Sequence, residues 1–292
     1  MTPVEFRRSQ RTANTAFGGI SYVERGSGPA ALFVHGVPLN GFHWRHALTA
    51  LADVRRCLAP DLMGLGYTEV APDQNVSFDR QAEMLLAFLD ALGVDEIDLV
   101  GNDSGGAIAQ ILATRAPERI RSLTLTNCDA HDNWPPEAFM PAVERARKGE
   151  FSAGLELIRQ NPAIARSGAG LGVAFQFPER LSDEIVEVYL APLVASDDRR
   201  ALIDRYVASM DCAQTLRIYD PLRGLQSPTL IIWGDSDVFF PEHWAHWLAE
   251  TIPGTRKTTV LQGAKLFFPE ERSEELIRLL REHWRAAEST SR

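Results

Sequence analysis

The sequence predicts an α/β fold with a mostly parallel sheet of eight strands, helices on both faces and an inserted helical cap. Short apolar runs alternate with amphipathic helical patterns through residues 1–130 and again through residues 223–292. Such alternation is typical of a parallel sheet that is covered on both faces. Residues 131–222 instead show helical patterns and no good strand. We therefore expect a core of residues 1–130 and 223–292 and a helical cap of residues 131–222.

The expected elements follow from local patterns along the chain. Strands are expected where short apolar or alternating runs end at turn-forming residues: residues 5–12, 19–26, 30–36, 55–60, 97–101, 121–127, 229–234 and 257–263. Core helices are expected where apolar residues recur at helical spacing: residues 44–52, 77–93, 107–116, 242–252 and 272–287. The cap helices are expected at residues 137–149, 151–160, 181–194 and 197–210.

Composition and charge exclude several classes of protein. The formal net charge is −9, and no basic stripe supplies the attraction that nucleic acids require. No apolar run reaches the roughly 18 residues of a membrane span, and the first residues lack the apolar segment of a signal peptide. Cys57, Cys128 and Cys212 are too far apart for a metal site or a disulfide framework. We expect a cytoplasmic protein with no cofactor and no metal, acting on a small-molecule substrate; a homodimer stays open.

A tight strand-to-helix turn is the most informative motif. A predicted strand runs into Asn-Asp-Ser-Gly-Gly, and a helix follows at once. A nucleophile on such an elbow needs small residues two positions before and after it. Asp103 has Gly101 and Gly105 at these positions, whereas Ser104 is preceded there by Asn102. We predict that Asp103 is the nucleophile; the simpler alternative is a glycine-rich turn whose aspartate caps the helix.

Two further motifs accompany this elbow, FVHGVPLNGFHWR at residues 33–45 and CLAPDLMGLGYTE at residues 57–69. Together the three motifs resemble the α/β-hydrolase superfamily, and within it the aspartate-nucleophile branch of haloalkane dehalogenases and epoxide hydrolases. The resemblance spans residues 18–285 and is weak only in the cap. It implies the α/β-hydrolase fold, with an oxyanion hole formed by the backbone N–H groups of Val37 and Ser104.

The resemblance also implies a carboxylate and then a histidine after the nucleophile. Asp237, in IIWGDSDVFFP, stands where the family places the carboxylate that orients the histidine. Asp235 is a weaker alternative and is better explained as a turn residue. The histidine is expected within GAKLFFPEE, but its position holds Leu266. The neighbouring Lys265 is an alternative base, although a solvated loop lysine explains it more simply.

The missing histidine changes the expected chemistry. In the aspartate branch the carboxylate forms an alkyl ester, and the histidine activates the water that hydrolyses it. With Leu266 in its place, we expect the ester to persist and burial to raise the pKa of Asp103. His131 follows the predicted strand at residues 121–127 and is the best substitute base.

The substrate pocket is expected between the oxyanion loop and the cap. Candidate pocket residues are histidine and aromatic residues of these two parts: His35, Trp44, Trp134, Tyr189 and Tyr206. Dehalogenases bind the halide with an asparagine and a tryptophan, whose positions here hold Val37 and Ser104. The His-Gly-x-Pro sequence typical of epoxide hydrolases is present. Their two cap tyrosines have candidates here, Tyr219 among them, although each also suits a packing role.

These observations leave three hypotheses. The first is a hydrolase for an epoxide, haloalkane or ester type of substrate, with a rearranged base. The second is a non-hydrolytic enzyme, a lyase, dehydratase or cyclase, that uses Asp103 as acid or base. The third is a catalytically silent binding protein with a retained pocket. The retained elbow and Asp237 favour an enzyme, and hydrolysis is the leading hypothesis.

Overall fold

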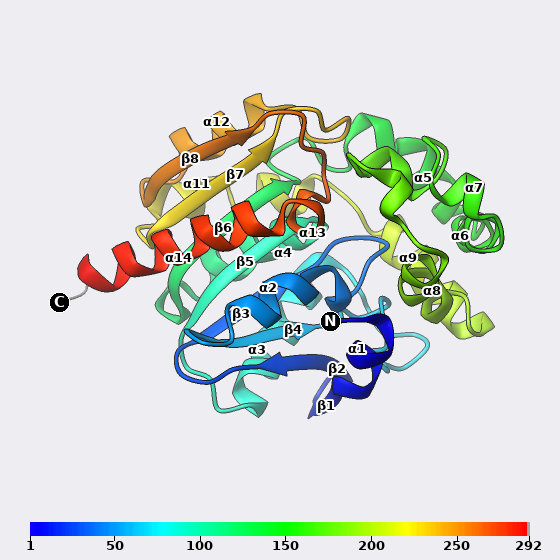
Figure 1. The fold of residues 1–292 in the computed structure, drawn as a ribbon, viewed down its shortest axis with the longest axis horizontal. Coiled ribbons are helices and arrows are strands. Elements are labelled where there is room, and N and C mark those ends of the chain that lie inside the picture. Colours follow the sequence, from blue (N-terminus) through cyan, green and yellow to red (C-terminus); the bar gives the residue numbers. More distant parts are fainter. Residues whose placement is uncertain (291–292) are drawn as a thin grey trace.

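The computed structural model describes residues 1–290 and contains one eight-stranded sheet with the order β1-β2-β4-β3-β5-β6-β7-β8 (Figure 1). The strands are β1 (Gln10–Thr15), β2 (Gly18–Arg25), β3 (Ala30–Val34), β4 (Arg56–Pro60), β5 (Ile97–Asp103), β6 (Ile120–Cys128), β7 (Thr229–Gly234) and β8 (Thr255–Leu261). β2 pairs antiparallel with β1 and β4, and the other neighbouring pairs are parallel. The predicted α/β fold is confirmed.

The N-terminal segment differs from the prediction. The strand predicted over residues 5–12 is wrong in its first part, because α1 (Pro3–Ser9) is a helix and β1 begins only after it. A reciprocal capping box between Thr2 and Glu5 satisfies the first backbone N–H groups, and a proline occupies the first helical position. These end signals outweigh the short alternating pattern that suggested a strand.

Helices cover both faces of the sheet. The core helices are α2 (Arg45–Ala50), α3 (Phe78–Ala91), α4 (Ser104–Arg115), α12 (His243–Thr251), α13 (Phe268–Glu271) and α14 (Ser273–Thr290). Figure 1 shows α2 and α14 in front of the sheet, and these two helices contact each other. α3 and α4 pack together on the other face, where α4 contacts β5 and β6. Every residue of β3 and β5 is buried, as expected for central strands covered on both sides.

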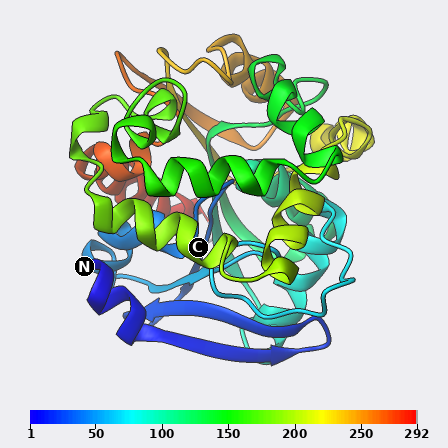
Figure 2. The same ribbon diagram turned by 90° about the vertical axis from the view of Figure 1, so that its right-hand side faces the viewer.

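The chain between β6 and β7 is helical, and its residues 140–208 lie beyond the carboxyl ends of the parallel strands (Figures 1 and 2). Its helices are α5 (Met140–Arg147), α6 (Phe151–Gln160), α7 (Pro162–Ala165), α8 (Asp183–Leu190), α9 (Asp197–Ala208), α10 (Ala213–Leu216) and α11 (Tyr219–Gly224). We call the part that carries α5 to α9, residues 140–208, the helical insertion. α10 and α11 instead contact α4 of the core.

Crossing a lipid bilayer would require one of the helices within residues 1–290 to be both long and apolar. None of these helices combines the length and the apolar character that crossing a membrane requires.

Candidate active site

Asp103 lies at the sharp turn between β5 and α4. Strand β5 ends at Asp103, and helix α4 begins at the next residue. The backbone of Asp103 has φ 55° and ψ −135°, a conformation that costs energy for a residue with a side chain. The turn is tight, because a Cβ atom at position 105 would overlap the backbone oxygens of Val34 and His35. The strained residue of the predicted elbow is therefore Asp103, and Ser104 is the first residue of the helix.

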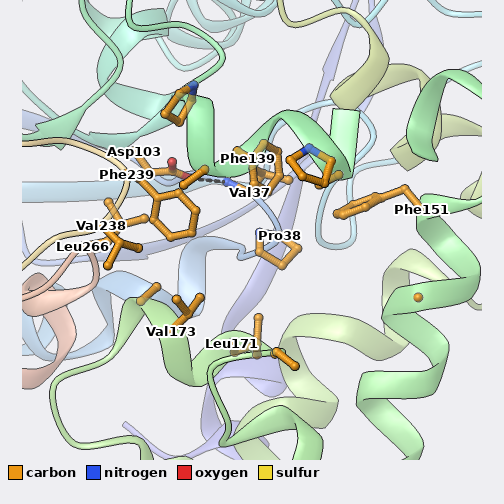
Figure 3. A pocket seen from close by; sticks show the side chains of 18 of the residues that line it. Val37, Pro38, Asp103, Phe139, Phe151, Leu171, Val173, Val238, Phe239 and Leu266 are labelled. Carbon is orange, nitrogen blue, oxygen red and sulfur yellow. Dashed lines mark hydrogen bonds between the residues drawn. The ribbon is translucent and has the colours of Figure 1, made fainter. Parts of the chain in front are cut away.

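Two backbone N–H groups hold the carboxylate of Asp103. The Val37 N–H donates to Oδ2 at 2.7 Å (Figure 3), and the Ser104 N–H also donates to this carboxylate. The loop that carries Val37 approaches very closely, since a Cβ atom at position 36 would overlap Oδ2 of Asp103. The two N–H groups predicted to form an oxyanion hole thus both act on the carboxyl of Asp103.

Burial controls the charge of Asp103. Burial raises the pKa of this carboxyl to about 8; the hydrogen bonds from Ser104 and Val37 lower it, and the nearby charge of Asp237 raises it. A carboxyl with a pKa of about 8 holds its proton through most of the neutral range. The expected rise in pKa is therefore present, and its largest cause is desolvation.

Asp237 follows β7 and is fixed by several donors. Oδ2 accepts from Nδ2 of Asn127 at 2.8 Å, and Oδ1 accepts from the Phe239 N–H at 2.9 Å. Burial raises the pKa of Asp237 to about 7 in spite of these donors. The alternative acid, Asp235, accepts the Gly263 N–H at 2.7 Å and behaves as a turn residue.

Leu266 occupies the loop that was expected to carry a histidine. Its side chain is 3% exposed and lines the same cavity as Asp103 (Figure 3). The loop is held through its backbone, because Nδ2 of Asn102 donates to the Leu266 carbonyl oxygen at 3.1 Å. Nζ of Lys265 donates to the Val173 carbonyl oxygen at 3.3 Å, so this ammonium is already engaged away from Asp103.

A buried ionic network lies under this loop. Nη2 of Arg45 donates to Oε1 of Glu270 at 2.6 Å, and the Tyr189 hydroxyl donates to Oε2 at 2.5 Å. Burial would raise the pKa of Glu270, but the charge and hydrogen bond of Arg45 and the nearby imidazole of His43, 3.6 Å away, lower it to about 2. The network therefore pairs a buried carboxylate with a buried guanidinium.

A cavity of about 350 Å³ opens above Asp103, between the sheet and the helical insertion (Figure 3). Its lining is mainly apolar and includes Phe139, Leu155, Leu171, Val173, Phe239 and Leu266. The charged residues among the described lining residues are Asp103, Asp129 and Arg145. A cavity of this size and character suits a small, largely apolar organic molecule.

The aromatic residues predicted for the pocket are buried elsewhere, and this corrects the sequence-based expectation. Trp44 packs against Phe33, and Trp134 packs against Phe78. Tyr206 packs against the same phenylalanine, and its hydroxyl lies 3.1 Å from Oγ of Ser104. None of the three predicted aromatic residues is among the described residues that line the cavity.

His35 and Tyr189 also have structural partners. Nε2 of His35 accepts the Leu62 N–H at 3.1 Å, while Tyr189 belongs to the buried Glu270 network. Both side chains are fully buried and absent from the described lining of the cavity. The two predictions fail for one reason, because residue type cannot distinguish a polar aromatic group that packs inside from one that faces a pocket.

The structure does not bring His131 to Asp103. Its backbone has φ 50°, and its ring packs 4.8 Å from Trp247 and 5.5 Å from Tyr219. The imidazole therefore belongs to an aromatic cluster outside the described lining of the cavity. The expectation that His131 supplies a base is not supported.

The match to known families agrees with this geometry. A family model described as alpha/beta hydrolase fold matches residues 29–271. The chain belongs to the alpha/beta hydrolase fold family. Relatives of this alpha/beta hydrolase are themselves enzymes, and among those named are hydrolases, which supports a hydrolase here.

Three known proteins illustrate what this chain is similar to. Haloalkane dehalogenase 2 of Mycobacterium bovis is 29% identical over 266 residues, which cover 89% of this chain and 90% of that protein. Cis-3-alkyl-4-alkyloxetan-2-one decarboxylase of Shewanella oneidensis is 29% identical over 245 residues, covering 80% and 75%. The structure of an epoxide hydrolase without ligand superposes with a TM-score of 0.78 at 19% identity, covering 95% of this chain and 98% of that one.

Asp129 is a site residue of this alpha/beta hydrolase that the sequence analysis did not select. It directly follows β6 and lines the cavity together with Asp103. The signal was present in the sequence, because an acidic residue that ends a buried parallel strand lies at the edge where ligands bind. Within residues 1–290, no group of histidine, cysteine or acidic side chains is arranged to hold a metal ion.

Proposed function

We propose that this chain is a hydrolase-fold enzyme that acts on a small, apolar organic electrophile of the epoxide, haloalkane or ester type, with Asp103 as the nucleophile. The observation that carries this proposal is the Asp103 carboxylate, held by the N–H groups of Val37 and Ser104 at the base of an apolar cavity. Because one oxygen is fixed by these donors, the other is free to approach a bound carbon atom.

The proposed reaction begins with covalent bond formation. Oδ1 of Asp103 attacks a substrate carbon, a carbon–halogen bond or an epoxide carbon–oxygen bond breaks, and an ester joins the aspartate to the substrate. Attack on the acyl carbon of an ester substrate would instead expel its alcohol and leave an acyl anhydride on Asp103. The developing charge of the later tetrahedral intermediate would fall on the oxygen that the two N–H groups already hold. With Leu266 at the position of the histidine, the ester needs another base for its hydrolysis.

A second candidate function is non-hydrolytic proton transfer, as in a lyase. It is favoured by the pKa of Asp103, which burial raises to about 8, because a protonated carboxyl is a proton donor and a poor nucleophile. A relative named as a decarboxylase shows that a similar chain supports a reaction other than hydrolysis.

Intact-mass spectrometry distinguishes the two functions. The protein is incubated with styrene oxide, bromobutane and a nitrophenyl ester, and we expect a mass increase that peptide mapping assigns to Asp103. Asp103→Asn should show neither adduct nor product, while Asp132→Asn, which changes an exposed neighbouring acid, should behave as wild type. When the product is released in water labelled with heavy oxygen, the labelled oxygen should appear in the carboxyl group of Asp103, because the water attacks the carbonyl carbon of the ester. Turnover without any label or adduct would support proton transfer instead, and an unchanged Asp103→Asn would exclude both functions.

A further inference from the structure

We propose that Asp129 is the acid–base residue of this site and performs the proton transfers that a histidine performs in the aspartate branch. The inference rests on the proposed function and deepens it, because it identifies how the covalent ester forms and how it is released. It requires that Asp129 touch the substrate beside Asp103.

The sheet places the two carboxyls side by side. Asp103 ends β5, and its register partner on the adjacent parallel strand β6 is Cys128. Asp129 is the next residue, so both acids leave the same edge of the sheet from strands that lie roughly 4.8 Å apart. Both side chains line the central cavity. Asp129 therefore faces the same bound molecule as Asp103.

The hydrogen bonding of Asp129 leaves its carboxyl available. Its backbone oxygen accepts from Nε2 of Gln110 at 2.8 Å, which fixes the main chain. Its side chain is 2% exposed, yet Oδ1 has no hydrogen-bond partner among the described residues. A buried carboxyl oxygen without a partner is costly unless it carries a proton or meets a ligand. A carboxyl that carries a proton and faces the cavity, where a ligand can contact it, avoids this cost.

The environment separates the protonation of the two acids. Burial and the charges of Asp103 and Asp237 raise the pKa of Asp129 well above its ordinary range. Asp103 receives two N–H donors that favour its ionised form, and Asp129 receives none on Oδ1. When two neighbouring carboxyls share a site, the less stabilised one retains the proton. We assign the more tightly held proton to Asp129, so that Asp103 is the first of the two acids to ionise, as the pH approaches about 8.

These charges support a complete cycle with an epoxide. Asp103 attacks a ring carbon, the ring carbon–oxygen bond breaks with its electron pair on oxygen, and Asp129 gives its proton to that oxygen. The products are a hydroxyalkyl ester of Asp103 and an ionised Asp129. Water then attacks the ester carbonyl while Asp129 takes one proton from this water, and the other proton of the water passes to the departing alkoxide oxygen. The diol leaves with Asp103 ionised and Asp129 protonated again. One carboxyl acting first as acid and then as base is established chemistry for paired carboxylates.

Other groups are poorly placed for this role. Tyr189 and Tyr206 are buried away from the cavity, and Lys265 is engaged with Val173. Arg145 is the remaining charged residue among the described lining residues, and a guanidinium does not release its proton in proteins. Asp129 is therefore the proton carrier that the described lining provides.

The decisive experiment uses Asp129→Asn with two substrates that differ in their need for an acid. Bromide leaves without a proton, so Asp129→Asn should form the butyl ester with bromobutane at a rate close to wild type. The ester should then persist, because the base is lost, and product formation should fall by roughly 10²–10⁴-fold. Styrene oxide needs the acid, so its adduct should form at a rate reduced by a similar factor.

Each outcome has a defined meaning. Equal losses with both substrates in ester formation would show a structural role and overturn the inference, as would normal turnover of the bromobutane ester in Asp129→Asn. Asp132→Asn is the matched control, and Asp129→Glu should recover part of the turnover with a shifted pH profile. Failure of wild type to react with either substrate would remove the proposed function itself, and this inference with it. A third outcome is that Asp103→Asn forms no adduct while Asp129→Asn behaves as wild type in every step. This result would support the proposed function and would exclude a role for Asp129.

Discussion

Replacing Leu266 by histidine should add a base at the position where the aspartate branch carries one. The leucine lines the cavity with Asp103, and its backbone is held by Asn102 independently of the side chain. An imidazole there would point into the cavity and activate water against the ester. General base catalysis contributes roughly 10²–10⁴-fold, so in an Asp129→Asn background we expect Leu266→His to accelerate ester hydrolysis within this range and the adduct seen by intact mass to disappear.

The same substitution should shift the pH profile and lower the stability. The pKa of Asp103 is raised to about 8, and a neighbouring imidazolium lowers a carboxyl pKa by roughly 1–3 units. The rate of ester formation rises with pH as Asp103 ionises. The pH midpoint of this rise should therefore move to lower pH. The leucine is 3% exposed, so losing its burial should cost at most roughly 1.5–3 kcal/mol of unfolding free energy.

The assay follows single-turnover ester formation and decay by rapid-quench mass spectrometry across a pH series, with urea unfolding beside it. Leu266→Asn in the same Asp129→Asn background is the matched control, because it introduces a polar side chain without a base and should not accelerate decay. The reasoning would be refuted if Leu266→His formed the ester normally and decayed no faster than Leu266→Asn while remaining folded.

Three further predictions concern stability and the position of Asp103. The pKa of Asp103 is raised to about 8 in the folded state, so its contribution to stability is greatest below about pH 4 and is lost as the pH rises toward the folded value. The Tm of wild type relative to Asp103→Asn should fall over this window, and calorimetry showing a rise would contradict the sign. Gly36→Ala should displace the Asp103 carboxylate, because the added Cβ overlaps Oδ2; ester formation should fall by roughly 10²-fold or more, and unchanged mass-adduct kinetics would disprove this. Glu270→Gln leaves Arg45 buried beside a neutral partner, and urea unfolding should show a loss approaching roughly 3–5 kcal/mol; no measurable loss would show that water compensates the guanidinium.

The fold could be predicted because local signals and the buried pattern agree. The alternation of strands and helices and the elbow around Asp103 are encoded by neighbouring residues, and the structure places both as expected. The first segment could not be predicted as well, since a cap formed by Thr2 and Glu5 competes with a short alternating pattern.

The cavity lining was harder to predict because it depends on side-chain direction across distant elements. Tyr189 and Tyr206 have the chemistry of pocket residues, but their hydroxyls find partners inside the protein. Asp129 is a different case: its place directly after a buried strand was a weak signal in the sequence, and the register of β6 beside β5 brings it to the cavity that Asp103 also lines.

The hydrogen bond from Asn102 to the Leu266 carbonyl oxygen has a wider consequence. It ties the loop to the strand that carries Asp103, and the neighbouring Phe267 N–H is likewise bound to the Ala174 carbonyl oxygen at 3.1 Å. The course of the loop is thus specified by main-chain atoms, which every amino acid supplies. The side chain at position 266 can consequently be replaced without changing the course of the loop, so that a single substitution alters reactivity while the surrounding structure stays in place.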